Sequence, residues 1–293
     1  MTARARAGLA RLLAASGADD LDADLATFTG ADDVYPSRFQ AGHATAVAYA
    51  AATLAAFPSR AIRIDLDHAA IASEGYRHVR LAGESVAAPR DPLTGFYDTA
   101  DGRQIFLHVN FPHHRSRAVA LLRAQATREA LQEAIGEWKM PVLDAALTAA
   151  GAISAPVLSA DEWRDLVPPQ PLVTIEKISD SAPRRHDHPR IVDFTRVLAG
   201  PTCGRVLAEQ GAKVTRIDNP LYPDLVSYRL DANRNKIEAR LDLRQPDDQA
   251  QLLHLLRDAD VFLQAYRPGV AENLGLDAAS LGRVNEGLVH ASL

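Results

Sequence analysis

Apolar and polar positions in the last third of the chain follow a regular order of strands and helices. Pro201 and Pro246 occupy favourable first-turn positions of two predicted helices. Because strands separated by helices usually pair in parallel, this order predicts a parallel α/β sheet. The predicted strands are 190–194, 213–217, 237–243, 261–263 and 289–293, and the helices are 201–210 and 246–259.

The first half of the chain has a different pattern, with more helices than strands. An Ala-rich run predicts a helix over 44–57 that ends at Pro58. Asp101-Gly102 joins two β-prone runs between residues 93 and 109, which is a strong hairpin signal. This half therefore predicts a smaller α+β domain. Its other predicted elements are a basic amphipathic helix over the first 15 residues, a strand at 62–66, and helices at 68–76, 113–123, 127–136 and 141–150.

A polar, Pro-containing stretch without periodicity separates the two halves. Residues 179–190 have the composition of a linker. We therefore predict two parts: residues 1–178, which are helical with a small α+β domain, and residues 191–293, which form a Rossmann-like parallel sheet with helices. The expected fold class is α/β.

Composition argues against several classes of function. The net charge is -5 and the basic residues are dispersed, so we expect no nucleic-acid partner. No apolar run approaches the roughly 18 to 20 residues that cross a bilayer, and no secretory signal is recognisable, so we expect a cytoplasmic protein without membrane function. Cys203 is the single cysteine, which excludes an internal disulfide, and we expect it to serve in packing.

The loop from Val197 to Gly204 lies between a predicted strand and a predicted helix. Backbone N–H groups at such a helix start can bind phosphate, but the same loop is also compatible with a purely structural turn. The sequence contains neither GxGxxG nor a Walker A motif. The loop alone therefore leaves both interpretations open.

Further motifs extend this loop into a longer pattern. Together with the run from Asp193 to Pro201, they resemble the N-terminal part of the family III CoA-transferases, which include formyl-CoA and carnitine CoA-transferases and the α-methylacyl-CoA racemases. The resemblance implies a fold that recognises acyl-CoA, a carboxylic acid as second substrate, and no permanently bound cofactor or metal. The matching blocks are 207–218, 235–236, 241–246, 258–270, 274–276 and 288–292.

The resemblance also implies which residues contact CoA. Guanidinium groups suit phosphate oxygens, although Arg244 and Arg267 could equally be solvated surface residues. Tyr266 could stack on adenine or fill the core. At Ala265 the family often carries a polar Asn, so one expected contact is weakened here. The implied contact positions are Val197, Leu198, Leu241, Arg244, Tyr266 and Arg267.

Residues 20–178 resemble the later portion of the same family. Residues 44–76 are similar to its long helix, strand and helix, residues 96–106 to its small-domain hairpin, and residues 137–157 to a helix that leads into a Pro-containing turn. Later family sequence thus precedes earlier family sequence. We expect either a permuted chain or the remnant of a tandem, and the apparent early stop after the last strand favours the tandem.

The nucleophile implied by the resemblance is an aspartate that attacks the acyl-CoA thioester. Counting back from Gly42 places Arg38 at that position, and a guanidinium cannot attack a thioester. Asp32 and Asp33 lie a few residues upstream and are weak candidates. The His/Asp acid–base pair of the racemase branch cannot be placed, and adjacent His113 and His114 are expected to point apart rather than bind a metal.

Two functions therefore stay open after the sequence alone. The first is transfer of CoA between an acyl-CoA thioester and a carboxylic acid. The alternative is a non-catalytic CoA-binding or dimerising subunit that works beside a complete transferase, which Arg38 favours. In either case we expect a homodimer, or a hetero-oligomer in which another chain supplies the aspartate. A nicotinamide-dependent enzyme is disfavoured because the glycine fingerprint and the acidic ribose ligand are missing.

Overall fold

The computed structural model describes residues 2–31, 34–35, 39–87, 89–182 and 187–293. The chain forms two compact units. The larger unit combines residues 1–88 with residues 171–293, and the smaller unit consists of residues 89–170. The N-terminal segment and the C-terminal sheet therefore belong to one body, although the smaller unit separates them along the chain.

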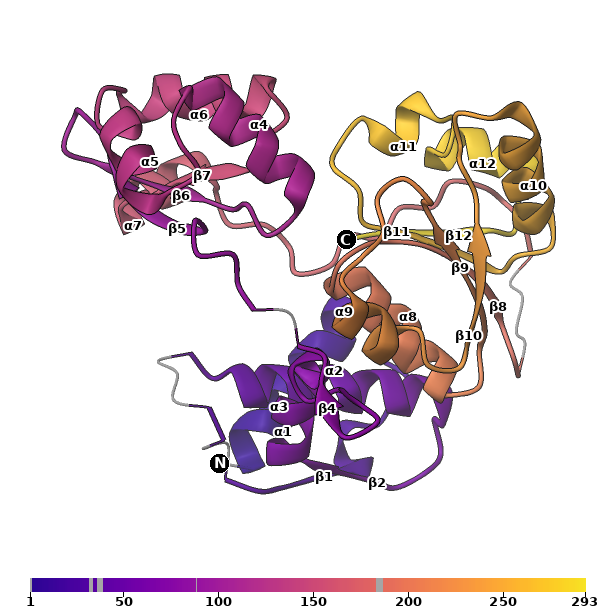
Figure 1. Ribbon diagram of the computed structural model, residues 1–293. Coiled ribbons are helices and arrows are strands. Elements are labelled where there is room, and N and C mark those ends of the chain that lie inside the picture. Colours follow the sequence, from indigo (N-terminus) through magenta and orange to yellow (C-terminus); the bar gives the residue numbers. More distant parts are fainter. Residues whose placement is uncertain (1, 32–33, 36–38, 88, 183–186) are drawn as a thin grey trace. The chain divides into compact units, whose positions relative to one another are not determined.

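A five-stranded parallel sheet forms the centre of the C-terminal part, in the order β10-β9-β8-β11-β12 (Figure 1). The chain runs outward from β8 in one direction through β9 and β10, and then in the other through β11 and β12. The predicted parallel α/β sheet is confirmed. The direction in which successive strands are added to the sheet reverses between β8 and β11, while all strands stay parallel. The strands are β8 (Arg190–Phe194), β9 (Lys213–Asp218), β10 (Lys236–Arg240), β11 (Val261–Gln264) and β12 (Val289–Ser292).

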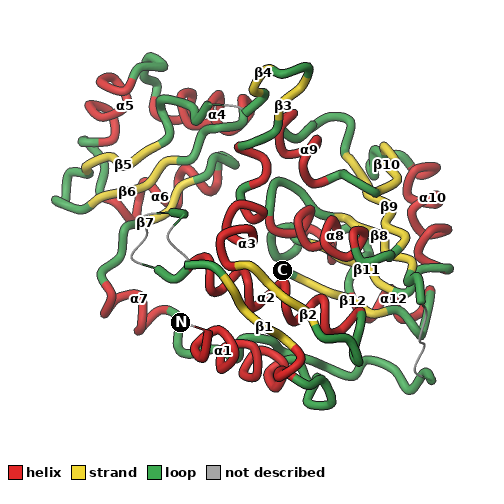
Figure 2. Tube along the Cα trace, turned by 90° about the horizontal axis from the view of Figure 1, so that it is seen from below, coloured by secondary structure: helices red, strands yellow, loops and turns green. Residues whose placement is uncertain are grey.

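Helices pack on both faces of this sheet because successive strand residues point to opposite sides. Ile191 joins a cluster with Ala208 of α8, whereas Val192 joins a second cluster with Leu252 of α10. Figure 2 shows the helices around the strands of this sheet. The helices of this part are α8 (Ala199–Glu209), α9 (Val226–Ala232), α10 (Pro246–Arg257), α11 (Val270–Asn273) and α12 (Ala278–Val284).

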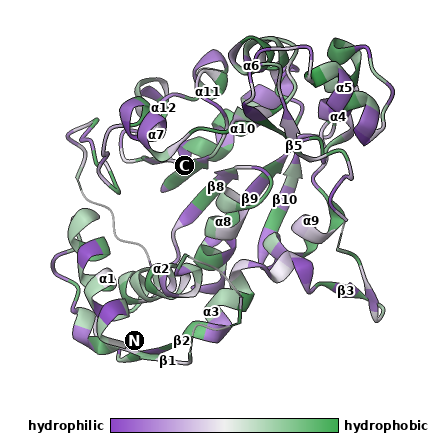
Figure 3. Cartoon of the chain, turned by 90° about the vertical axis from the view of Figure 1, so that its left-hand side faces the viewer, coloured by the Kyte–Doolittle hydropathy of each residue, from purple (hydrophilic) through white to green (hydrophobic). Residues whose placement is uncertain are grey.

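The N-terminal segment contains a second parallel strand pair, β1 with β2, connected through α2. Ala46, Ala50 and Leu54 recur every four residues on α2 and are completely buried, so this small-residue face permits close packing. α1 mixes hydrophobic and hydrophilic residues along its length (Figure 3), as its Arg and Leu content predicts. The elements are α1 (Thr2–Ala15), the 3₁₀ turn η1 (Ala23–Leu25), β1 (Ala26–Thr29), α2 (Ala41–Ala56), β2 (Ile62–Asp65), α3 (Leu66–Ser73), η2 (Gly75–Arg77), β3 (Arg80–Leu81) and β4 (Glu84–Ser85).

Arg205 of α8 connects the N-terminal segment to the sheet. Its guanidinium is almost completely buried and donates to the carbonyl of Ala72 at 3.1 Å and to the hydroxyl of Tyr49 at 3.3 Å. Tyr76 and Tyr228 add an edge-to-face ring contact with centroids 4.8 Å apart. Polar and aromatic contacts thus join two segments that lie far apart in the sequence.

The smaller unit has an antiparallel sheet of three strands, in the order β5-β6-β7, with helices. The predicted hairpin is confirmed: Gly102 adopts a φ of 71° in the turn between β5 and β6. Gly151, with a φ of 70°, follows the C-terminal end of α6. The elements are β5 (Gly95–Asp98), β6 (Gln104–Leu107), α4 (Pro112–Leu122), α5 (Arg128–Ile135), α6 (Met140–Ala149), β7 (Ser154–Pro156) and α7 (Ala160–Leu166).

Between α7 and β8 the described residues form no helix or strand. β8 begins at Arg190, and the compact units divide at residues 88 and 171. The linker predicted over 179–190 stays a prediction. The assignment of residues 1–178 and 191–293 to two portions of a family stays a prediction. No helix within the described ranges is long and apolar enough to cross a bilayer.

Candidate functional site

The candidate site is a cavity of about 150 Å³ at the carboxyl edge of the parallel sheet. Because all five strands run in one direction, the loops that follow them converge at this edge, next to the reversal between β8 and β11. The cavity is lined mainly by apolar side chains, with polar groups from two loops. Its lining residues are Phe194, Ile217, Asn219, Leu241, Asp242, Leu243, Arg244, Tyr266, Val270 and Leu274.

Tyr266 provides an aromatic wall of this cavity. Its ring packs against Phe194 with centroids 4.5 Å apart and planes tilted by 31°. Its backbone N–H donates to the side-chain oxygen of Gln264 at 2.9 Å, which fixes the start of the loop after β11. Burial raises the pKa of Tyr266 to about 12. The phenol therefore stays neutral across the physiological pH range.

Arg244 provides the cationic group of the cavity, and Asp242 holds it there. The guanidinium is exposed and donates to both carboxylate oxygens of Asp242, at 2.9 Å from Nε and 2.8 Å from Nη2. The hydrogen bond from Arg244 lowers the pKa of Asp242 to about 2. This fork–fork geometry holds Arg244 in an orientation in which phosphate oxygens could replace the carboxylate.

The structure brings together three of the six predicted contact residues. Leu241, Arg244 and Tyr266 line one cavity, whereas Val197, Leu198 and Arg267 are not among its lining residues. Val197 and Leu198 form the turn before α8, and Arg267 is exposed in the loop between β11 and α11.

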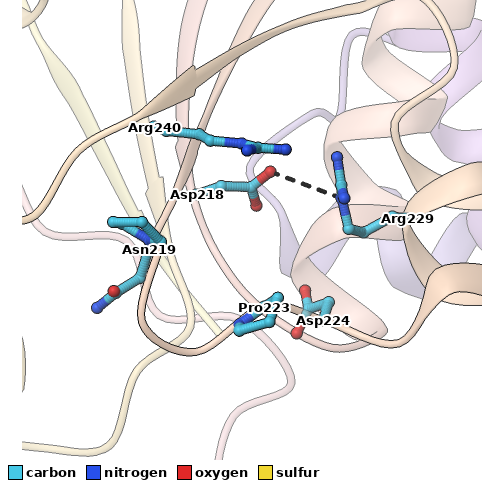
Figure 4. Close-up of a pocket in the computed structure, with 7 residues that line it drawn as sticks. Asp218, Asn219, Pro223, Asp224, Arg229 and Arg240 are labelled. Atoms are coloured by element: carbon cyan, nitrogen blue, oxygen red, sulfur yellow. Dashed lines mark ion pairs between the residues drawn. The ribbon is translucent and has the colours of Figure 1, made fainter.

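A second cavity of about 250 Å³ lies beside the first and shares Asn219 with it. Figure 4 shows Asp218 pointing from the end of β9 toward Arg229, 3.9 Å away. Beneath this cavity Arg216 is almost completely buried and donates to Asp218 at 2.8 Å, to Asn233 at 2.6 Å and to Asp224. The residues that line it are Asp218, Asn219, Pro220, Pro223, Asp224, Arg229 and Arg240.

The start of the motif, Asp193 to Gly204, is explained by the packing of α8 against β8. Lys236 donates to Asp193 at 2.7 Å and to the carbonyl of Pro201 at 2.8 Å, and Thr195 also donates to Asp193. A Cβ on Gly204 would lie 2.5 Å from an Asp193 oxygen, so α8 can approach β8 this closely only with glycine there. These contacts hold α8 against the sheet near the candidate site.

Cys203 lies on α8 near the ion pair of Asp193 and Lys236. Burial, and then the charge of Asp193, raises the pKa of the thiol. A nucleophilic cysteine needs the opposite shift, so the geometry agrees with the packing role expected from the sequence.

Several sequence predictions concern other residues. Arg38, Asp32 and Asp33 lie outside the described residues, so their catalytic assignment stays a prediction. The expectation that His113 and His114 point apart is wrong: their ring centroids are 4.0 Å apart on the first turn of α4. Within the described ranges, no group of three or more metal-ligating side chains comes together.

Sequence reasoning missed Asn219 and Asp242 as parts of the site. Asn219 follows β9 directly and lines both cavities, and Asp242 precedes the arginine that it orients. Their position immediately after parallel strands is the signal that could have identified them, since loops at that edge line ligand sites.

Comparison with known proteins identifies the C-terminal part. Residues 187–293 match the family model described as CoA-transferase family III. Over 117 residues, 36% of this chain and 30% of the relative, the sequence is 37% identical to a probable fatty acyl-CoA transferase of Mycobacterium tuberculosis. A formyl-CoA:oxalate CoA-transferase of Afipia carboxidovorans is 31% identical over 116 residues, 36% of this chain and 27% of the relative.

These matches cover a limited part of each protein. The chain spans less than a third of the length of these curated relatives. A solved structure of the Mycobacterium tuberculosis protein matches 35% of this chain and 32% of that chain at 36% identity, with a TM-score of 0.33.

Proposed function

Since residues 187–293 belong to CoA-transferase family III, we propose that they bind the CoA moiety of an acyl-CoA thioester at the carboxyl edge of the parallel sheet. The convergence of Leu241, Arg244 and Tyr266 on one cavity is the observation that most supports this proposal. The adenine ring packs against Tyr266 and Leu241, and the phosphate groups accept hydrogen bonds from Arg244. Val197, Leu198 and Arg267 contact the same ligand beyond the cavity, as the family resemblance implies.

The reaction we propose is transfer of CoA between an acyl-CoA thioester and a carboxylic acid. An enzyme carboxylate attacks the thioester carbonyl, which forms an acyl–enzyme anhydride and releases CoA thiolate. The thiolate attacks the enzyme-side carbonyl of this anhydride, so the donor acid leaves and an enzyme–CoA thioester remains. The acceptor carboxylate then attacks that thioester and releases CoA thiolate, which attacks the acceptor-side carbonyl of the second anhydride to give the new acyl-CoA and the free enzyme carboxylate. Arg38 cannot perform the first attack, so the enzyme carboxylate comes from Asp32 or Asp33 or from another chain in an oligomer. If no carboxylate is available, the chain is the non-catalytic CoA-binding subunit of a complete transferase.

An oligomer is part of this proposal because the region around the predicted linker exposes large apolar side chains. Clustered exposed apolar residues are typical of protein–protein interfaces. Within the larger unit, these exposed residues lie close together in the sequence: Leu172, Val173, Ile175 and Ile178. Native mass spectrometry of the purified chain tests this, and a monomer at all concentrations would contradict it.

Calorimetric titration with CoA tests the binding proposal. We expect wild-type binding in the micromolar to millimolar range, weakened about tenfold by Arg244→Gln. Arg257→Gln on α10 is the matched control, because it removes an exposed arginine that does not line the cavity. If wild type binds no CoA at millimolar concentration, the proposal is wrong.

A second experiment separates the transferase from the non-catalytic subunit. The chain is incubated with a panel of acyl-CoAs and carboxylic acids, and any enzyme-bound thioester is trapped with hydroxylamine and mapped. A hydroxamate at Asp32 or Asp33 supports an independent transferase. CoA binding without an adduct supports the subunit.

A further inference from the structure

The loop before α8 contains a backbone conformation that needs external support. Val197 has a φ of 68°, in the left-handed region. A β-branched residue there is a genuine outlier, because its side chain crowds the backbone. Such conformations persist only where surrounding contacts impose them. The structure around Val197 must therefore supply those contacts.

Asp224 supplies them from the loop between β9 and α9. Its carboxylate accepts the backbone N–H of Val197 at 3.2 Å and the Nε–H of Arg196 at 3.2 Å. Its side chain is only 1% exposed, so water does not compete effectively for these bonds. One buried carboxylate thus holds two consecutive residues of the loop.

Arg216 fixes Asp224 in turn. Both side chains are 1% exposed, and the guanidinium of Arg216 donates to Asp224, to Asp218 and to Asn233. Burial alone would lower the pKa of Arg216, but Asp218 and Asp224 together raise it above its ordinary value. Because Arg216 lies on β9, Asp224 connects the Val197 turn to the sheet itself.

From this geometry we propose that Asp224 is a positioning residue for CoA binding. It holds the Val197–Leu198 backbone in the strained conformation that directs this turn and the following start of α8 toward the ligand. The inference rests on the proposed function, in which Val197 and Leu198 contact CoA. Asp224 itself does not contact CoA in this proposal; it affects CoA binding by fixing the backbone of the Val197 turn.

Two substitutions at Asp224 test the proposal by calorimetric titration with CoA and by thermal unfolding. Asp224→Asn keeps an acceptor but loses the charge that holds Arg216, and Asp224→Glu keeps the charge but displaces the acceptor by one methylene. We expect the dissociation constant for CoA to rise about tenfold in both, equivalent to about 1.4 kcal/mol. Asp224→Glu keeps the ion pair, so it remains informative if Asp224→Asn does not fold.

Asn233→Ala is the matched structural control. It removes another partner of Arg216, but Asn233 accepts no bond from the turn and lines neither cavity. We expect it to lower the melting temperature while the dissociation constant stays within twofold. If the Asp224 variants also change only the melting temperature, Asp224 is merely structural and the proposal is overturned.

A double-mutant cycle with Val197→Gly tests whether Asp224 acts through the strained turn. Glycine adopts a φ near 68° without steric conflict, so the turn depends less on Asp224. We expect Asp224→Asn to change the CoA affinity less than twofold in the Val197→Gly background. If Asp224→Asn still weakens CoA binding tenfold in the Val197→Gly background, Asp224 does not act through the Val197 turn. Failure of wild type to bind CoA would instead overturn the proposed function, and the positioning role with it.

Discussion

Lys236 donates to Asp193 across 2.7 Å, and both side chains are completely buried. Burial lowers the pKa of Lys236, and the neighbouring carboxylate offsets part of that shift. Thr195 and the carbonyl of Pro201 complete the bonding of the pair. The pair joins β10 to β8 beneath the start of α8, so it holds in place the loop that the family motif encodes.

Breaking this pair should destabilise the fold strongly. Lys236→Met removes the cation and leaves the Asp193 carboxylate buried without its charge partner, which typically costs about 3–5 kcal/mol of unfolding free energy. Urea unfolding followed by circular dichroism measures the change. Arg164→Ala, which breaks an exposed pair with Asp161, should have no measurable effect. Equal effects of the two substitutions would contradict the structural role of the buried pair.

Gly204 should tolerate no side chain. Gly204→Ala places a Cβ 2.5 Å from an Asp193 oxygen and 2.9 Å from Lys236 Nζ, so α8 must move away from the sheet. Overpacking of this kind costs about 1–3 kcal/mol. Gly282→Ala is the matched control, since its Cβ meets no atom within 4 Å on helix α12. There we expect a gain of about 0.5–1 kcal/mol from helix propensity. Urea unfolding free energies of the two variants should therefore change in opposite directions.

The parallel sheet could be predicted because its strands are locally encoded. Residues 190–194 and 261–264 are short apolar runs, and the helices between strands begin near prolines. Strand β7, Ser154–Pro156, was missed because it has three residues, ends in proline, and exists through pairing with the distant β6. Strand β1 was missed for a similar reason: Ala26–Thr29 is ordered by pairing with β2, 36 residues away.

The site could be predicted only in part. Parallel strands bring Leu241 and Tyr266 to one edge, so their convergence follows from the order of strands and helices. The partnership of Asp224 with Val197 could not be inferred, because it depends on how the loop after β9 folds back over 27 residues. Arg216 likewise lies in an ordinary strand, and only tertiary packing buries its guanidinium.

Tyr266 should make stability fall at alkaline pH. Its pKa is about 12 in the folded protein and near 10 when unfolded, so between these values the unfolded chain has already lost the proton that the folded chain retains. Its contribution is therefore present below pH 10 and is lost progressively toward pH 12, by on the order of 2 kcal/mol. Tyr266→Phe should unfold at a urea midpoint that falls less over this range. A parallel fall in both proteins would contradict the shift.

Substitutions of Arg244 and of Asp242 should change the affinity for CoA in opposite directions. Asp242 competes with phosphate for the Arg244 guanidinium, so Asp242→Asn should lower the dissociation constant for CoA about threefold, whereas Arg244→Gln should raise it about tenfold. Because the pKa of Asp242 is about 2, its carboxylate remains charged at any workable pH, and only substitution removes the competition.

Titrations at two salt concentrations sharpen the comparison of these two variants. The salt dependence of CoA binding should steepen in Asp242→Asn, where the cation is freed, and flatten in Arg244→Gln, where it is absent. If both substitutions weaken binding, Asp242 orients Arg244 more than it competes for it, and the pair acts as one unit in holding the ligand.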